Sequence, residues 1–161
     1  MEKSKQIEHN LCAANADEEY EKISIMVDSG ASETVASEEY FPAYELIETT
    51  ASGVTYSSAA DKTAEPIVNL GQKLVEVVDE YGTCSWAKFQ ICRGLGQGRI
   101  LGSVSRLVQA NHTVVFQSPE LGSYIENNFN GYRTYLRQCN GSYYLDLWVK
   151  KVTTPFTRPG M

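Results

Sequence analysis

The sequence has few of the residues from which metal sites and disulfide frameworks are built. It contains two histidines and four cysteines, and no Cys-x-x-Cys pair occurs among them. A structural zinc site needs four such ligands at close spacing, which this pattern does not supply. We therefore expect no metal and no other cofactor, and free thiols in a reducing compartment.

The chain also lacks a long apolar run, an apolar leader and a surplus of positive charge. No apolar stretch approaches the ~18 residues that span a bilayer, and the polar N-terminus does not match a secretory signal. Its 14 basic and 20 acidic residues give a net charge of -6, which is a poor electrostatic match for nucleic acid. These absences predict a cytoplasmic chain with neither a membrane segment nor a direct nucleic-acid partner.

The composition that is present predicts one sizeable hydrophobic core. With 161 residues, 42% hydrophobic and 21% charged, the chain is of ordinary globular composition. Along it we expect a flexible leader over residues 1–20, a main domain over 21–118, an extension over 119–150 and a polar tail over 151–161. The long leader and the tail are poor in bulky apolar residues.

An apolar run rich in β-formers ends at a carboxylate. Residues 23–27 predict a short buried strand, and Asp28-Ser29-Gly30-Ala31 follows directly. Ser29 offers a hydroxyl to nearby backbone, and Gly30 permits a close approach that a side chain would forbid. The sequence thus predicts an oriented, partly desolvated carboxylate, although an ordinary turn after a strand would show the same tripeptide.

The middle of the chain predicts further short strands. Residues 33–36 suggest a short strand or a turn, 37–42 one helical turn ended by proline, and 54–59 with 66–70 a β-hairpin with a polar tip. Gly71 would separate that hairpin from an antiparallel pair of strands over 74–78 and 84–92. The glycine-rich residues 93–99 lack the lysine and the spacing of a phosphate loop and predict a flexible connection.

A second apolar segment that ends at glycine precedes the one helix that the sequence predicts. Ile100-Leu101-Gly102 suggests a strand, Ser103 is a suitable N-cap for a short amphipathic helix, and Asn111 is suited to its end. A strand over 113–117 follows.

The last third of the chain predicts an antiparallel meander. Three strand-like runs, over 123–126, 132–137 and 142–149, are joined by Asn130-Gly131 and Asn140-Gly141. Asn-Gly is the strongest short hairpin signal. Its aromatic residues would pack on the main core or, if exposed, form a surface for a partner.

The order of these motifs resembles the retropepsin-like half of an aspartic protease. Asp28-Ser29-Gly30-Ala31 and Ile100-Leu101-Gly102 match the two active-site motifs of that family, with a hairpin between them and a helix after the second. The resemblance implies that these two motifs lie side by side in the fold. Residues 101–107, 114–116, 122–126 and 140–146 are similar to the protease region of copia-type retrotransposon polyproteins. The resemblance covers roughly residues 22 to 149.

The resemblance implies an all-β fold, mainly β with one short helix, in which residues 21–118 form a retropepsin-like acid protease barrel half and a C-terminal antiparallel β-meander follows. It assigns catalysis to Asp28 and support of the active-site loop to Ser29, Gly30 and Ala31. It assigns the supporting second motif to Ile100, Leu101 and Gly102. The flap that covers the bound peptide would include Tyr56, Ser57, Ser58 and Ala59.

One aspartate cannot serve as acid and base at once in the addition of water to a peptide carbonyl. Two close carboxylates can, because they share a proton. We therefore expect a homodimeric aspartic endopeptidase in which the second copy supplies a second Asp28, acting on a peptide or polyprotein substrate.

Two other classes of function stay open at this stage. The chain could be a proteolytically inactive retropepsin-like module for dimerisation or peptide binding, or an unrelated all-β interaction domain that works through its C-terminal meander. A serine hydrolase built on Ser29 is disfavoured because Ser29 has no obvious imidazole partner: His9 lies in the leader and His112 at the end of the predicted helix.

Overall fold

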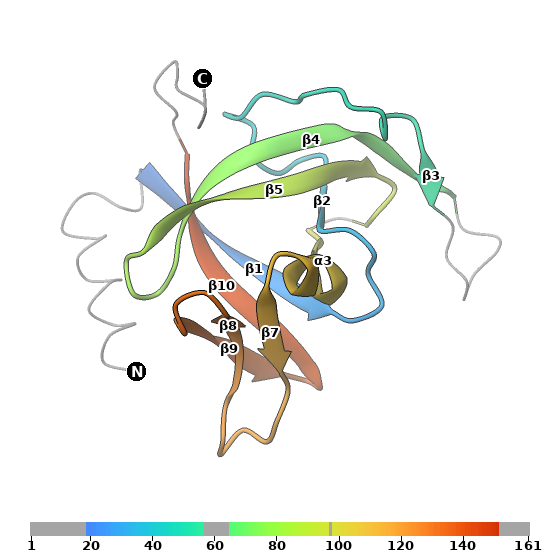
Figure 1. Ribbon diagram of the computed structural model, residues 1–161. Coiled ribbons are helices and arrows are strands. Elements are labelled where there is room, and N and C mark those ends of the chain that lie inside the picture. Colours follow the sequence, from blue (N-terminus) through green and yellow to red (C-terminus); the bar gives the residue numbers. More distant parts are fainter. Residues whose placement is uncertain (1–18, 57–64, 97, 152–161) are drawn as a thin grey trace.

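The computed structural model describes residues 19–56, 65–96 and 98–151 (Figure 1). Within these ranges the protein is mainly β, with one short helix, as the sequence predicts. No helix among the described residues is both long and apolar enough to cross a membrane.

Six strands close into a ring. They are β1 (Tyr20–Asp28), β2 (Val35–Ser37), β4 (Ile67–Val78), β5 (Cys84–Arg93), β6 (Ile100–Ser103) and β10 (Ser142–Lys150). Their order in the sheet is β4-β5-β2-β6-β1-β10, and β10 pairs again with β4 through Trp148↔Val78 and Val149↔Val77. Every strand of the ring therefore has a neighbour on both sides.

The hydrophobic core fills this ring. Alternate residues of β1 point inward, so Ile23, Ile25 and Val27 are buried while their neighbours are not. The other five strands contribute most of the remaining core side chains, including Ala36, Val75, Phe89, Ile91, Ile100, Leu147 and Val149. Phe41, from the loop after β2, packs against Phe89 with ring centroids 4.8 Å apart and the rings tilted by 39°.

The remaining elements lie outside the ring. Strand β3 (Thr55–Tyr56) pairs with the start of β4. Helix α3 (Val104–Gln109) follows β6 and leads into β7 (His112–Val115), β8 (Ser123–Asn127) and β9 (Arg133–Cys139), which run antiparallel and join β10. In Figure 1 this meander lies below strands β4 and β5, and the turn between those two strands contacts it, because the Tyr132 hydroxyl donates a 2.6 Å hydrogen bond to Asp79 Oδ2.

The meander follows the Asn-Gly signals of the sequence. Asn140 and Gly141 have φ values of 49° and 79°, as a two-residue hairpin turn with positive φ at both positions requires. The predicted strands over 123–126, 132–137 and 142–149 correspond to β8, β9 and β10, with ends that differ by one or two residues.

Two local predictions are wrong. Of residues 37–42, Ser37 ends strand β2 and the residues from 38 onward lie in turns instead of a helical turn, and Phe41 there has a φ of 60°. Gly71 does not separate two strands, because β4 runs without a break from Ile67 to Val78 and shifts register against β5 between Asn69 and Gly71. This register shift is a β-bulge. The position requires glycine, because a Cβ at Gly71 would lie 2.5 Å from the Ile47 carbonyl oxygen.

Candidate active site

Asp28 is the last residue of β1, where the strand leaves the ring. Its side chain is half-buried, and its Oδ1 accepts a hydrogen bond of 2.8 Å from the Gly30 amide. A Cβ at Gly30 would lie only 3.3 Å from the same oxygen, so glycine permits the close approach. The turn thus holds one carboxylate oxygen, Oδ1, through the Gly30 amide.

The two motifs that the resemblance pairs lie side by side in the sheet. Strand β6 runs parallel to β1, with Val27 opposite Gly102 and Asp28 opposite Ser103. The strands pack tightly here, because a Cβ at Gly102 would lie 2.9 Å from the Ile25 Cγ2. Ile100 is buried in the core and Leu101 is half-buried. Since β6 also pairs antiparallel with β2, it lies between the two strands that flank the Asp28 turn.

Ser103 ties the Asp28 turn to helix α3. Its side chain is fully buried, and its hydroxyl donates a 2.6 Å hydrogen bond to the carbonyl oxygen of Ala31. Ser103 Oγ also accepts a hydrogen bond of 3.1 Å from the Arg106 amide, which makes Ser103 the N-cap of α3. The Ser103 amide in turn donates to Thr34 Oγ1 at 3.1 Å. The sequence identifies the N-cap but not these contacts across the site.

An ion pair makes a second connection between the turn and the helix. The Arg106 guanidinium donates to both carboxylate oxygens of Glu33, with 3.0 Å between Nε and Oε2 and a second bond from Nη2 to Oε1. The hydrogen bond to Glu33 raises the pKa of Arg106. Arg106 is solvent-exposed, so the pair orients the two segments more than it stabilises the fold. Neither residue belongs to a sequence pattern that predicts this ion pair.

The predicted flap is described only at its base. Tyr56 lies in β3 opposite Ile67, and its hydroxyl accepts a 3.2 Å hydrogen bond from Asn69 Nδ2. Asn69 is fully buried and also donates to Gln90 Oε1 at 3.0 Å, so this network fixes the base of the hairpin on β5. Ser57, Ser58 and Ala59 lie outside the described residues.

Main-chain groups of the glycine-rich segment after β5 form hydrogen bonds with side chains in and after β2. The Ser37 hydroxyl is within hydrogen-bond distance of the Gly96 and Arg99 carbonyl oxygens, at 2.8 and 3.0 Å. The Gly98 amide donates to Glu39 Oε1 at 2.8 Å, so this amide already binds a carboxylate of the chain itself. That geometry gives no support to a phosphate site.

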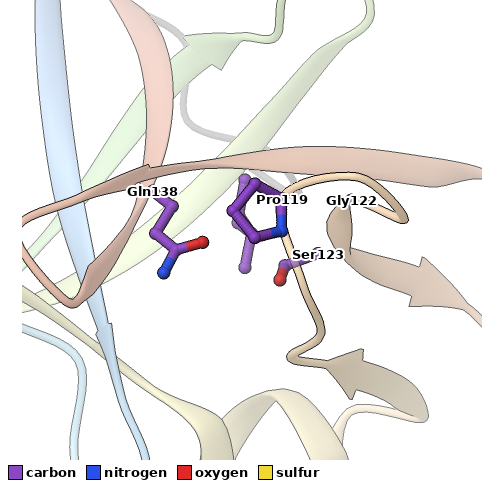
Figure 2. Close-up of a pocket in the computed structure, with 5 residues that line it drawn as sticks. Pro119, Gly122, Ser123 and Gln138 are labelled. Atoms are coloured by element: carbon purple, nitrogen blue, oxygen red, sulfur yellow. The ribbon is translucent and has the colours of Figure 1, made fainter.

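A separate hollow of about 290 Å³ lies in the meander. It is lined by Pro119, Gly122, Ser123, Leu136 and Gln138, and Figure 2 shows the Pro119 ring, the Ser123 hydroxyl and the Gln138 amide around it. The Ser123 hydroxyl there is already bonded to the main chain of Gln117. None of the lining residues belongs to the Asp28 turn or to β6.

The arrangement around Asp28 can orient a carboxylate at the edge of the fold. In the described part of the chain, no group of three or more histidine, cysteine, aspartate or glutamate side chains is arranged to hold a metal ion.

No protein-family model, curated protein or solved structure matches the chain. The features of this chain that bear on its function are therefore the motifs and their geometry.

Proposed function

We propose that this chain is one subunit of a homodimeric aspartic endopeptidase of the retropepsin type, encoded as part of a copia-type retrotransposon polyprotein. The observation that carries the proposal is the pairing of β1 with β6, in which Asp28 lies opposite Ser103 and Val27 opposite Gly102. Juxtaposition of the Asp-Ser-Gly-Ala turn and the Ile-Leu-Gly segment is what the resemblance leads us to expect.

Each subunit would bring one carboxylate to a shared water molecule. Two aspartates at close range cannot both ionise, so one keeps its proton and polarises the peptide carbonyl while the other takes a proton from the water. The bond from the Gly30 amide to Oδ1 favours a fixed orientation of Asp28, with Oδ2 free to face the water and the partner's carboxylate. Ser29 is exposed beside it and available for contacts with the second subunit.

The substrate would bind as an extended peptide between the Asp28 turns and the hairpin that starts at β3. Main-chain hydrogen bonds to a hairpin edge add a strand to the sheet, and side-chain pockets then select the sequence. The hydrogen bonds of Asn69 to Tyr56 and Gln90 support a firm base for such a hairpin.

Cleavage of denatured protein substrates by wild type and by Asp28→Asn tests the proposal. The asparagine keeps an oxygen for the Gly30 amide and therefore keeps the turn, but it cannot exchange a proton at this position. We expect wild type to cleave between about pH 4 and 7, Asp28→Asn to be inactive, and the exposed control Glu120→Gln to cleave as wild type does. Equal cleavage by Asp28→Asn and wild type would rule out the assignment.

Mixing the two chains tests whether both subunits supply an aspartate. If subunits exchange freely, an equal mixture places half of the wild-type chains in dimers that contain one Asp28→Asn subunit. Activity per wild-type chain should then fall to about half. Unchanged activity in the mixture would show that a single chain is sufficient for catalysis.

An inactive peptide-binding module remains the second candidate, because the chain itself contributes a single Asp-Ser-Gly turn. It predicts that a peptidomimetic inhibitor of aspartic proteases binds while no substrate is cut. Binding that survives Asp28→Asn, together with no cleavage by wild type, would favour this candidate.

A further inference from the structure

Strand β1 presents one face to the core and the other to solvent. Its core-facing residues alternate with outward-facing ones, and Met26 and Asp28 lie on the outward face. Asp28 still follows the geometry of the strand, because it pairs with Ser103 of β6. The face that carries the candidate catalytic carboxylate therefore continues across the sheet into the strands beside β1.

Two strands from the last third of the chain supply the neighbours on that face. The order in the sheet is β1-β10-β9 (Figure 1). Met26 pairs with Tyr144 of β10, and Tyr144 pairs in turn with Arg137 of β9. Directly opposite residues of an antiparallel pair have their side chains on the same face, with Cβ atoms about 5 Å apart. The Arg137 guanidinium lies 5.0 Å from the centroid of the Tyr144 ring, so these two side chains meet.

Arg137 is held over this ring by hydrogen bonds on its other side. Its Nε and Nη2 donate to Asp146 Oδ2 and Oδ1 at 2.9 and 3.1 Å, and Nη2 also donates to the Ser24 hydroxyl at 3.2 Å. The Ser24 hydroxyl donates to Asp146 Oδ1 at 2.7 Å. Burial alone would raise the pKa of Asp146, but the hydrogen bonds from Arg137 and Ser24 lower it. The carboxylate therefore stays ionised and neutralises the charge of Arg137.

The chemistry of this surface favours an uncharged, flat group. Asp146 already binds the Arg137 guanidinium through two nitrogens, so a substrate carboxylate would gain little there. The surface offers the Tyr144 ring, the guanidinium plane and, next to Asp28, the Met26 thioether. Aromatic side chains stack on rings and guanidinium planes and pack well against methionine sulfur. Tyr144 and Met26 are half-buried and Arg137 is exposed, so each has surface open to a ligand.

We propose that Tyr144 and Arg137 form a substrate subsite that takes an aromatic side chain two or three residues from the cleaved bond. Met26 and Asp28 are about 6.6 Å apart along β1, and Tyr144 lies about 5 Å to the side of Met26. Tyr144 is therefore about 8 Å from Asp28, and an extended peptide advances about 3.3 Å per residue. The subsite rests on the proposed function. The site residues that the resemblance assigns all precede Ser103, so this inference adds β9 and β10 to the site.

Mapping of the cleavage sites in denatured proteins by mass spectrometry tests the subsite. The measured quantity is the number of cuts with phenylalanine, tyrosine or tryptophan two or three residues from the cleaved bond, divided by the number with alanine, serine or glutamate there. We call this quantity the aromatic ratio and expect it to be well above the ratio in the substrate proteins themselves. A variant that merely folds less well cuts every site more slowly and leaves the aromatic ratio unchanged.

Two variants of the subsite and one matched control carry the test. Tyr144→Ala removes the ring and should lower the aromatic ratio by roughly fivefold. Arg137→Gln removes the plane over that ring and should lower the ratio in the same direction. Tyr135 is 43% exposed and lies on the same face of β9, but it pairs with Tyr124 of β8, away from β1. Tyr135→Ala should keep the wild-type ratio.

The outcomes separate the two proposals. A wild-type aromatic ratio in Tyr144→Ala, or an equal loss in Tyr135→Ala, overturns the subsite and leaves the protease intact. A wild-type profile without aromatic preference at these positions does the same and needs no variant. A wild-type chain that cleaves nothing overturns both proposals. Loss of the preference in Tyr144→Ala, with the preference kept in Tyr135→Ala, supports both.

Discussion

Ser103 offers the most direct test of how the candidate site is held together. Its hydroxyl caps α3 and donates to the Ala31 carbonyl in the Asp28 turn, and the side chain is fully buried. Loss of an N-cap hydroxyl costs about 1 kcal/mol. A partly buried carbonyl left without its donor costs about 1–3 kcal/mol more. Ser103→Ala should therefore lower the free energy of unfolding by about 2–4 kcal/mol.

The matched control lies two residues further along the same helix. Ser105 is exposed, and its hydroxyl accepts a single bond of 3.3 Å from Gln109 Nε2. We expect Ser105→Ala to change the free energy of unfolding by no more than about 0.5 kcal/mol. Urea unfolding followed by tryptophan fluorescence is a suitable assay, because Trp148 is only 8% exposed in the folded chain.

If both alanine variants unfold at the same urea concentration, the bond from Ser103 to Ala31 has no measurable energetic weight. The geometric account of the site would then be wrong at this point. If Ser103→Ala is less stable as expected, its cleavage at a temperature where it remains folded should also fall, since the Ala31 carbonyl is part of the turn that orients Asp28.

Three further predictions address the bulge, the closing strand and the buried thiol. Gly71→Ala should destabilise the fold by more than about 2 kcal/mol, since its Cβ would meet the Ile47 carbonyl at 2.5 Å and its φ is 138°. Gly53→Ala, whose Cβ would meet nothing within 4 Å, should lower the thermal unfolding temperature less than Gly71→Ala does. A chain truncated before β10 should show no cooperative unfolding by circular dichroism, whereas a folded truncated chain would contradict the closed ring. Burial raises the pKa of Cys92 to about 11, so iodoacetamide at pH 8 should label the native chain, in mass-spectrometric peptide maps, at the exposed Cys84 and Cys139 well before Cys92. Equally fast labelling of Cys92 would show that its site opens readily.

The features that the sequence predicts well are those that short-range chemistry determines. The hairpin turn at Asn140-Gly141 needs two residues with positive φ, and few other dipeptides adopt that conformation easily. The helix start at Ser103 follows from a side chain that can accept an amide three residues later. Both signals are contained within a few residues, so no knowledge of the fold is required.

Gly71 shows how a local signal can mislead. A glycine between two β-type runs suggests a break, and here it allows one long strand to continue past the close Ile47 carbonyl. The amide of Ile47 donates to the Gln72 carbonyl at 2.8 Å, and the Gln72 amide donates back at 2.9 Å. Glycine is needed at position 71 because the segment around Ile47, which is far from Gly71 in the sequence, pairs with β4 at this point.

The contacts that complete the candidate site lie even further apart in the chain. Ser103 and Ala31 are 72 positions apart, and Arg106 and Glu33 are 73. Neither pair follows a spacing that a helix or a strand imposes, so both emerge only once β6 is placed beside β1. The resemblance to retropepsins predicts that placement at the level of the motifs and gives no residue-level account of how Ser103 and Arg106 support the turn.

Strand β10 shows how strongly the position of Asp28 depends on distant residues. It pairs with β1 over seven positions, from Tyr20↔Lys150 to Met26↔Tyr144, on the side of β1 opposite to β6. Its buried side chains Leu147, Trp148 and Val149 contribute roughly 5–9 kcal/mol of hydrophobic stabilisation. That amount is comparable with the whole stability of a domain. The segment expected as an extension thus supplies the strand that closes the ring, and the strand that ends at Asp28 is held from both sides because of it.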